Sequence, residues 1–262
     1  SSYGSIVASG SPGHKSAAGH VRICQRDENA AIGWTQLGDD FNGKAAQDRA
    51  GSSIALSSGG IVAIAAEGNT DNGSETGHVR VFGTGVIFTI PTTLNTSSVS
   101  TKPKLNKEGN KLTVLSEQHY ENISSNAIAN LRINYGRNGQ VQSYQYSESD
   151  ASWNYLGDKI ESTSLNDISG GTIDINADGD VIAIGYPKIV ETGYVRVYNY
   201  DSSDNSWNQI GSDITGSANE LFGKSLSLDL CGNNIAIGAP YSGDVSGGKI
   251  QVYTNNSNTW TL

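Results

Sequence analysis

Long hydrophobic runs, clustered charge and methionine are all missing from this sequence, and each absence excludes a class of protein. The longest apolar segment, residues 86–90, is far shorter than the ~18 residues that a membrane-spanning helix needs. Only 16% of the residues are charged, the net charge is −9, and Lys and Arg are scattered singly. Because anionic proteins repel nucleic acid and anionic lipid, we expect neither a nucleic-acid partner nor a membrane span.

Methionine does not occur at all, and cysteine occurs twice, at Cys24 and Cys231. The missing initiator predicts that an upstream segment such as a signal peptide has been removed, which indicates a secreted or cell-surface protein. Two cysteines are too few to define a disulfide framework. In an oxidising compartment they could form one disulfide, and two small buried thiols are the alternative.

Asn-X-Ser/Thr sequences agree with secretion, because they are the acceptors of N-linked glycans. All four lie in polar, turn-like stretches, with acceptor residues Asn72, Asn95, Asn122 and Asn255. We therefore expect a glycosylated protein.

Glycine is abundant, with 32 residues, and no stretch shows the 3.6-residue hydrophobic period of a helix. Apolar residues instead alternate with polar ones, as at Leu226, Leu228 and Leu230. This pattern is typical of short strands with one buried face, joined by tight turns.

One pattern recurs five times along the chain. The segment NIAIGAPYSGDVSGGKIQVY at residues 234–253 is close to VIAIGYPKIVETGYVRVY at 181–198, and three weaker copies precede them. The equivalent apolar positions are Val7, Val62, Leu112, Ile182 and Ile235. A second strand, opened by glycine, follows each of these first strands. In four units a third strand then carries a tryptophan: Trp34, Trp153, Trp207 or Trp260.

Four antiparallel strands repeated at roughly 40 to 55 residues are typical of a β-propeller blade. We expect one domain, residues 1–262, of about five blades that start near residues 6, 61, 111, 181 and 234. The segments before each new unit, such as 52–60 and 225–233, are assigned as fourth strands, so the fifth blade lacks one outer strand. Membership of a larger propeller is the alternative. The tryptophans are expected to fill the space between blades, with a carbohydrate-binding aromatic row as the alternative.

The order of Phe222-Gly223, a strand, a turn and the segment 235–240 (IAIGAP) resembles the FG-GAP repeats of integrin-α-type β-propellers. The whole unit also resembles long repeat arrays in secreted proteins of algae and other marine microbes. The resemblance covers nearly the whole chain and implies a propeller fold. Such propellers serve adhesion, scaffolding and occasionally catalysis, so the resemblance is weak for function.

The resemblance also implies a calcium loop before the GAP strand. The corresponding residues are Asp174, Asn176, Asp178, Gly179 and Asp180, but Ile182 occupies the last ligand position. A plain β-turn with polar flanks is therefore favoured over a calcium site.

Catalytic motifs are not found. The serine-protease-like loop around Ser246 and the FGKS at residues 222–225 are both explained by the repeat. His20 and His78 occupy equivalent positions where other units have Gln, Tyr or Lys, which indicates a solvated strand position. We expect a protein that is not an enzyme, with no cofactor other than a possible calcium ion.

These features predict a non-catalytic structural or adhesive module of an extracellular assembly. Its partners would be other proteins, including neighbouring copies or a donor of the missing strand, and glycans. The insertion at residues 116–136 of the third unit and the loop face are the expected contact surfaces, because long loops in compact repeats are usually functional. A lectin-like or calcium-assisted binder that uses Trp or Asp residues on its rim is the alternative.

Overall fold

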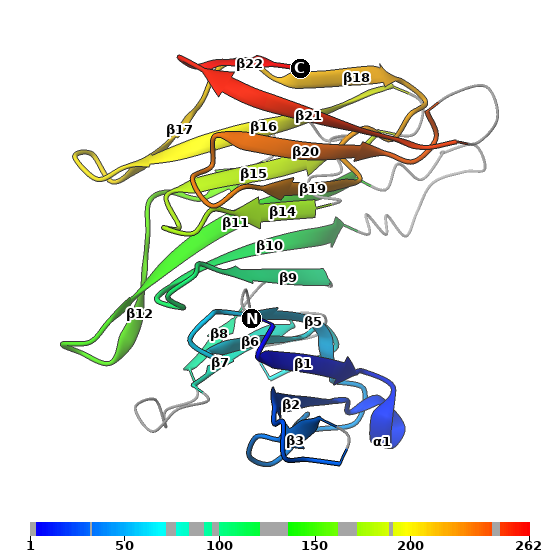
Figure 1. The fold of residues 1–262 in the computed structure, drawn as a ribbon, viewed down its shortest axis with the longest axis vertical. Helices are drawn as coiled ribbons and strands as arrows, with labels where there is room; N and C mark the ends of the chain where they lie inside the picture. Colours follow the sequence, from blue (N-terminus) through cyan, green and yellow to red (C-terminus); the bar gives the residue numbers. More distant parts are fainter. Residues whose placement is uncertain are drawn as a thin grey trace, which may run out of the picture.

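The structure is a computed structural model, which describes residues 4–31, 33–71, 77–83, 92–95, 100–120, 136–161, 172–188, 191–242 and 247–262. Nearly all regular structure in this part of the chain is β-strand (Figure 1), which confirms the predicted all-β class. The short segment α1 (His14–Ala17) has left-handed backbone angles at Lys15 and Ser16, so it is a tight turn. Among the described residues, no helix is long and apolar enough to cross a membrane.

The strands pair into five antiparallel sheets, each made of strands that follow one another in the chain. The first sheet contains β1 (Ile6–Ser11), β2 (His20–Arg26), β3 (Trp34–Gln36) and β4 (Phe41–Asn42), and the second contains β5 (Ala50–Leu56), β6 (Val62–Ala66), β7 (His78–Phe82) and β8 (Thr92–Asn95). The third contains β9 (Ser100–Leu105), β10 (Lys111–Tyr120), β11 (Gly136–Ser147), β12 (Ser152–Tyr155) and β13 (Ile160–Glu161). The fourth contains β14 (Thr172–Ile175), β15 (Val181–Tyr186), β16 (Thr192–Asp201), β17 (Ser206–Gln209) and β18 (Ile214–Ala218), and the fifth contains β19 (Ser225–Leu228), β20 (Asn234–Ala239), β21 (Lys249–Asn256) and β22 (Thr259–Thr261).

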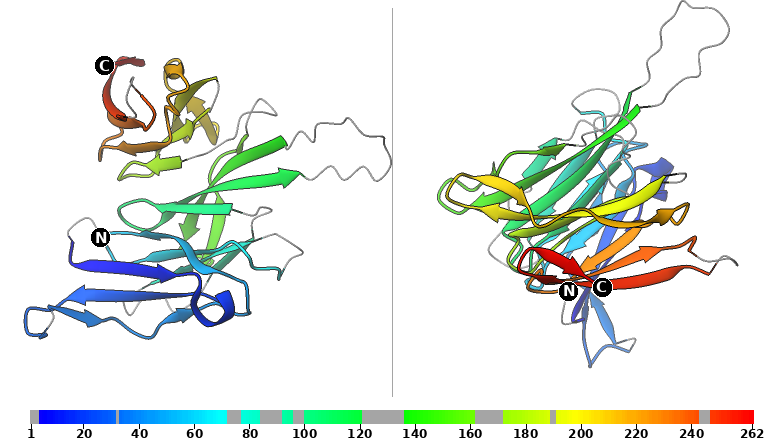
Figure 2. Two further views of the ribbon diagram at one scale, coloured as in Figure 1. Left: turned by 90° about the vertical axis from the view of Figure 1, so that its right-hand side faces the viewer. Right: turned by 90° about the horizontal axis from the view of Figure 1, so that it is seen from above.

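The five sheets pack in chain order and form a curved row (Figures 1 and 2). Their opening strands touch in series: β1 contacts β5, β5 contacts β9, β9 contacts β14, and β14 contacts β19. The first and fifth sheets lie at opposite ends of this row, and within the described ranges no strand pairing joins them. The row is therefore open, and a closed ring of five blades stays a prediction.

The sheets group the strands differently from the sequence-based assignment. The strand at 50–56, assigned there as the last strand of the first unit, pairs with β6 and opens the second sheet. In the same way β19 pairs with β20, so the fifth sheet has four strands and no outer strand is missing. The first sheet is the one that differs, because β1 corresponds to β20 in the repeat but pairs only with β2, whereas β20 pairs with both β19 and β21. The physical reason is the short turn between β5 and β6, which brings these two strands together as a hairpin.

Aliphatic side chains fill the space between neighbouring sheets. Val195 and Val197 of β16 lie in one cluster with Ile235 and Ile237 of β20, and all four are at most 1% exposed. Equivalent residues form the other junctions: Val21 and Ile23 with Val62 and Ile64, Val79 and Val81 with Leu112 and Val114, and Val141 with Ile182 and Ile184. Each such side chain contributes about 1.5–3 kcal/mol when it is fully buried. We call this repeated contact the inter-sheet junction.

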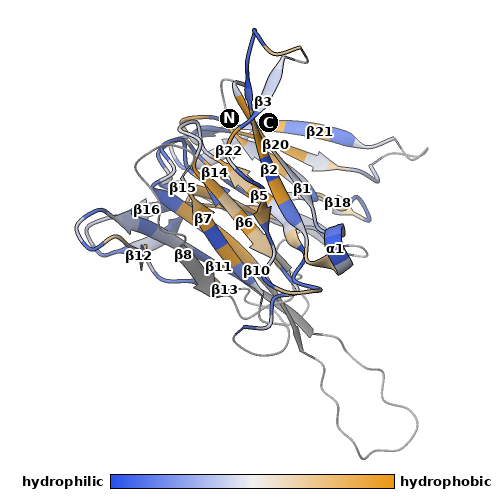
Figure 3. Cartoon of the chain, turned by 90° about the horizontal axis from the view of Figure 1, so that it is seen from below, coloured by the Kyte–Doolittle hydropathy of each residue, from blue (hydrophilic) through white to orange (hydrophobic). Residues whose placement is uncertain are grey.

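Polar residues separate the buried ones along strands such as β2 and β7. Figure 3 shows this alternation along β2 and β7. Because neighbouring side chains of a strand point to opposite faces, a sheet in the middle of the row buries apolar residues on both faces. The second and fourth sheets show the result in β6 and β15, where every residue is buried.

The Phe222-Gly223 pair explains how one sheet approaches the next. The Phe222 side chain is fully buried in the junction of the fourth and fifth sheets. Gly223 has φ +87°, and a Cβ on it would lie 3.0 Å from the carbonyl oxygen of Tyr194 in the neighbouring sheet. Gly51, at the equivalent position in β5 of the second sheet, has φ +88°. Glycine is required here because it alone adopts this backbone conformation readily at such close approach.

Candidate functional site

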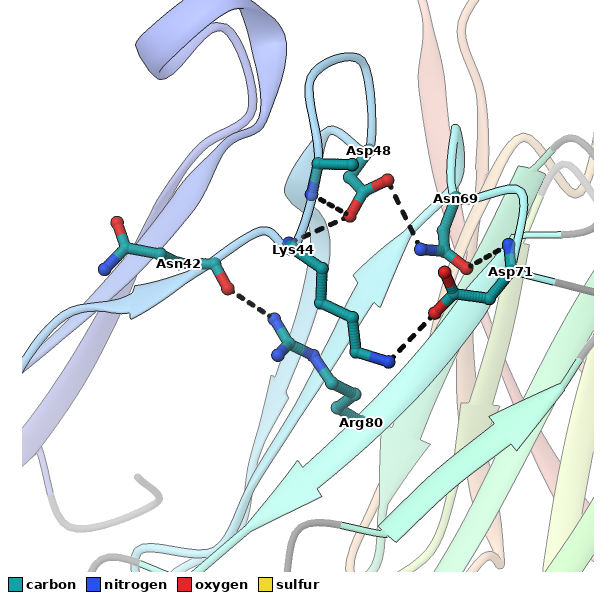
Figure 4. A network of polar contacts seen from close by, with 7 residues as sticks. Asn42, Lys44, Asp48, Asn69, Asp71 and Arg80 are labelled. Carbon is teal, nitrogen blue, oxygen red and sulfur yellow. Dashed lines mark hydrogen bonds and ion pairs between the residues drawn. The ribbon is translucent and has the colours of Figure 1, made fainter.

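Several buried polar groups meet at the junction of the first two sheets (Figure 4). Asp48 lies in the turn before β5, Asn69 follows β6, and His78 opens β7. Each of these side chains is at most 2% exposed. The turn that carries Asp48 has left-handed residues on both sides, Gln47 and Arg49, so the carboxylate is directed inward by an unusual backbone path.

Hydrogen bonds hold the Asp48 carboxylate from several directions (Figure 4). One oxygen, Oδ2, accepts from the amides of Lys44 and Ala45 at 2.9 and 3.0 Å, and the other accepts from Nδ2 of Asn69 at 3.3 Å. Asn69 in turn accepts a hydrogen bond from the amide of Asp71 at 3.1 Å. Such charge-assisted bonds stabilise a buried carboxylate. The hydrogen bonds of Asp48 and Asn69 connect the segment after β4 to the loop after β6.

Two cations complete the network and link the two sheets. The Lys44 ammonium lies 2.9 Å from Oδ2 of Asp71, and the hydrogen bond between them lowers the pKa of the Asp71 carboxyl. Arg80 of β7 donates from Nη2 to the carbonyl oxygen of Asn42 in β4 at 2.7 Å. Its Nε is buried and has no partner among the described residues.

His78 is the unusual member of this site. Its side chain is 1% exposed, so the solvated position expected from the sequence is wrong. Burial, together with the positive charges of Arg80 and Lys44, lowers the pKa of its imidazole to about 4. The ring is therefore neutral at pH 7, and neither ring nitrogen has a hydrogen-bond partner in the described part of the chain. Such a ring can accept a proton or a hydrogen bond.

The fifth sheet contains an equivalent network that explains what the site does for the fold. Glu220 corresponds to Asp48 in the repeat, and it accepts hydrogen bonds from the amide of Ser217 and the hydroxyl of Ser242 at 3.1 and 3.2 Å. Lys249 corresponds to His78 and forms an ion pair with Glu220 at 2.9 Å. The acid-centred contact is thus a repeated structural feature. In the second sheet, the neutral His78 replaces the cation.

A second polar site is a pocket of about 320 Å³ between the fourth and fifth sheets. Its lining residues are Gly211, Ser212, Asp213, Ile214, Thr215, Tyr253, Asn258, Thr259 and Trp260. Arg196 fixes the Asp213 carboxylate with two hydrogen bonds of 2.9 and 3.1 Å. Burial raises the pKa of this carboxyl, but the hydrogen bonds from Arg196 and Gln209 outweigh it, and the net shift is downward. The pocket therefore presents a fixed anion beside two aromatic rings.

The tryptophans mainly connect neighbouring sheets, as predicted. Trp207 donates from Nε1 to the carbonyl oxygen of Leu156 in the preceding sheet at 3.0 Å, and Trp260 donates to that of Ile210 at the same distance. Trp153 packs against the apolar cluster of the second and third sheets. A buried indole usually finds such a partner for its N–H.

Asp174, Asn176 and Asp180 of the expected calcium loop are engaged within the protein. Asn176 accepts hydrogen bonds from the amides of Asp180 and Val181, both at 3.0 Å, and so closes the turn between β14 and β15. The Asp174 carboxylate binds Lys104 of the third sheet at 3.1 Å and the amide of Leu228 in the fifth sheet at 2.9 Å. The loop thus links three sheets. Within the described ranges, no three His, Cys, Asp or Glu side chains are grouped to hold a metal ion.

The other predicted positions are spread over the molecule. Asn255 lies at the end of β21, and its side chain accepts a hydrogen bond from the amide of Asn258 at 2.9 Å. Asn95 ends β8, whereas Asn72 and Asn122 are outside the described residues. Of the insertion at 116–136, residues 121–135 are also outside them, and the flanking residues extend β10 and β11 as a hairpin.

Cys24 and Cys231 are free thiols in the structure. Cys24 is half-buried in β2 of the first sheet, whereas Cys231 is exposed in the turn between β19 and β20 of the fifth. The two residues belong to opposite ends of the open row, so the disulfide considered from the sequence is not formed.

The last sheet exposes an apolar face. Ile250 and Val252 of β21 are 76% and 55% exposed, although strand residues of this type are normally covered. Tyr241 and Leu230 of the same sheet region are also more than 60% exposed. The sequence contained a signal for this surface, because Ile250 and Val252 align with Val195 and Val197, whose side chains are covered by the next sheet.

Comparisons with known proteins identify the fold. No family model and no curated protein matches the chain. An acylaminoacyl peptidase of Pyrococcus horikoshii is similar over 97% of this chain and 37% of its own, with a TM-score of 0.56 and 12% identity. The periplasmic gluconolactonase of Pseudomonas aeruginosa is similar over 92% and 62%, with a TM-score of 0.55 and 11% identity. The β-propeller domain of Cps50 (Swd1) from Myceliophteria thermophila is similar over 96% and 62%, with a TM-score of 0.52 and 14% identity.

These likenesses support a propeller-like arrangement of the five sheets. The chain spans less than two thirds of each of the three structures. None of the three is an integrin-type propeller, so the FG-GAP resemblance stays a hypothesis. The expectation that the protein is not an enzyme is contradicted, because a peptidase and a gluconolactonase share this architecture. The absence of known catalytic motifs from the sequence does not exclude catalysis, because a propeller fold is compatible with catalysis as well as with binding.

Proposed function

We propose that this chain is a secreted, glycosylated propeller protein that serves as a structural or adhesive module and binds other proteins through its exposed surfaces. In this proposal each sheet is one blade, of the FG-GAP type, and the propeller is open between its first and fifth blades. The extracellular location is supported by the sequons.

The observation that carries the proposal is the apolar face of the fifth sheet. Ile250 and Val252 lie two residues apart on one strand and are both more than half exposed. Contiguous apolar surface of this kind marks protein contact sites, because leaving it in water costs free energy. No comparable set of exposed aliphatic residues occurs on the described faces of the second, third or fourth sheets, which have neighbours.

The test is cross-linking and mass spectrometry on the protein purified from its native source. We expect cross-links to other polypeptides from lysines near the fifth sheet, such as Lys249, and glycan mass on peptides that contain the sequons. Native protein that sediments as a monomer, carries no glycan and forms no intermolecular cross-links would contradict the proposal.

A second candidate function, binding of a saccharide, is favoured by the pocket between the fourth and fifth sheets. Trp260 and Tyr253 provide ring surfaces beside the fixed Asp213 carboxylate, an arrangement in which apolar contact and a few polar groups orient a small ligand. A glycan array with and without a chelator tests this function and its calcium dependence. Ser212→Tyr, which fills the pocket, is expected to abolish any signal, whereas the exposed Ser203→Tyr serves as the control.

A further inference from the structure

The fifth sheet keeps the residues with which every earlier sheet contacts its successor. Val195 and Val197 of the fourth sheet are 0% and 1% exposed under the fifth. Their equivalents in the fifth sheet, Ile250 and Val252, are aliphatic as well but have no described sheet over them. Ile250 and Val252 are therefore exposed in the single chain, although the equivalent aliphatic pair of the fourth sheet is buried in an inter-sheet junction.

The glycines of the fifth sheet also indicate that another sheet packs against it. A Cβ on Gly185 or Gly193 of the fourth sheet would collide with the carbonyl oxygens of Gly223 and Phe222, which precede the fifth sheet. The equivalent positions of the fifth sheet are Gly238 and Gly248. Their nearest described atoms belong to their own sheet and its loop, yet both residues are glycine, as close approach of another backbone requires.

A series of backbone hydrogen bonds runs along the row and stops at the same place. In the turn between the first two strands of the second, third and fourth sheets, one amide donates to the equivalent carbonyl of the next sheet: Ser58 to Lys107 at 3.1 Å, Lys107 to Ala177 at 3.0 Å, and Ala177 to Leu230 at 3.0 Å. The series ends at Leu230, whose side chain is 67% exposed. The described residues provide no further turn to accept its N–H.

The complementary half of a junction is uncovered at the other end of the row. In the fifth sheet, Ile235 and Ile237 are the residues that cover the preceding sheet. Their equivalents in β1 are Val7, which is 44% exposed, and the exposed Ser9. Among the exposed large hydrophobic residues of the described chain, Ile250 and Val252 in the fifth sheet and Val7 in the first thus occupy positions that correspond to the two sides of one repeated contact.

From this correspondence we infer that two copies of the chain associate head to tail, with the Ile250–Val252 face of one copy packed on the Val7 face of the next. The contact continues the series of four junctions that the chain already forms. It is heterologous, so it leaves one free face at each end of a dimer and permits longer assemblies. This inference rests on the proposed interaction role and specifies one partner for it.

The test is sedimentation velocity of the purified full chain over a range of concentrations at 0.15 M salt. Wild type is expected to form dimers and larger species as concentration rises. Ile250→Asp and Val7→Asp, each of which blocks one face, are expected to weaken association at least tenfold, because either change places a charge in an apolar contact. Tyr155→Asp, at an exposed residue of the third sheet, is the control and is expected to associate like wild type.

Mixing the two blocked variants gives the decisive result. Each variant alone has one intact face, so a mixture is expected to form a dimer and nothing larger. A Val7→Asp variant that still dimerises with itself would indicate a symmetric contact and overturn the inference. Wild type that stays monomeric at all concentrations would also overturn it. If native protein is nevertheless cross-linked to other polypeptides, the proposed function stands and only the self-association fails. Circular dichroism of each variant confirms that the sheets are intact.

Discussion

Gly223 shows how a single residue sets the distance between two sheets. Its φ of +87° is strained for other residues, and the backbone of Tyr194 and Gly185 lies so close that a Cβ would have to displace it by a few tenths of an ångström. We expect Gly223→Ala to lower the free energy of unfolding by about 1–3 kcal/mol, because alanine is strained in the left-handed region and would push the sheets apart. Urea denaturation measures the free energy of unfolding of the variant and of wild type. Gly247→Ala, where a Cβ meets nothing within 4 Å, is the matched control. Equal stability of the two variants would contradict the explanation.

His78 makes stability depend on pH through its burial. Its pKa is about 4 in the folded protein and 6.5 in the unfolded chain, so the unfolded chain binds more protons between these values and stability rises with pH in this window. From pH 5 to pH 7 we expect a gain of about 2 kcal/mol from this group. Urea denaturation at both pH values should show that His78→Leu loses most of the gain. His20→Leu, at the equivalent and more exposed position, should keep it, and a gain unchanged in His78→Leu would refute this account.

Pairs of residues on neighbouring strands also repeat between sheets. Arg22 binds Asp40 in the first sheet, and Arg196 binds Asp213 in the fourth, each through two hydrogen bonds. The Arg196 side chain is 18% exposed and stacks over Tyr194 at 4.9 Å, whereas that of Arg22 is 50% exposed.

The environment of the two arginines therefore predicts different costs for the same change. Arg196→Gln should lower the free energy of unfolding by about 2–3 kcal/mol, because it leaves a partly buried carboxylate unpaired and removes the ring contact. Arg22→Gln should cost less than about 1 kcal/mol, as expected for an exposed ion pair. Thermal or urea unfolding of both variants checks this prediction. A larger effect at Arg22 would show that burial does not determine the strength of the pair.

Strands were easier to predict than the sheets they form. Alternating residues such as Leu226 and Leu228 indicate a strand whatever its partner, since the pattern depends only on which face is buried. The repeat has no intrinsic start, however, so it does not state whether 225–233 ends one sheet or opens the next. The short turn to β20 decides this, and hairpin pairing across short turns was the signal available in the sequence.

The polar sites were less predictable because they depend on contacts between distant segments. The repeat aligned His78 with Lys249, but the two side chains differ in burial, because His78 is 1% exposed and Lys249 is 35% exposed. The pocket beside Trp260 is likewise lined by residues from two sheets that are about 40 positions apart in the sequence, 211–215 and 253–260. Sequence periodicity predicts which face of each strand is buried, but it does not predict the cavities that remain between sheets after they have packed.

At the scale of the whole molecule, each sheet contacts mainly its neighbours in the row, as in other repeat architectures. Stability is then distributed unevenly, because the fifth sheet has one covered face and the fourth has two. We expect amide hydrogen exchange to be faster in β21 than in β16 under native conditions at concentrations too low for association. Equal protection of the two strands would show that the row unfolds as a single unit.

The same argument predicts how far the destabilising effect of a core mutation extends along the row of sheets. Ile237 is fully buried between the fourth and fifth sheets, and its truncation to alanine removes apolar contact worth about 2–4 kcal/mol. If coupling is mainly between neighbours, Ile237→Ala should accelerate exchange throughout the fifth sheet, less in the fourth, and not in the second. Ile64→Ala, the equivalent change between the first and second sheets, should give the reverse pattern. Exchange measured by mass spectrometry on both variants separates this gradient from cooperative unfolding, in which either change would accelerate every sheet alike.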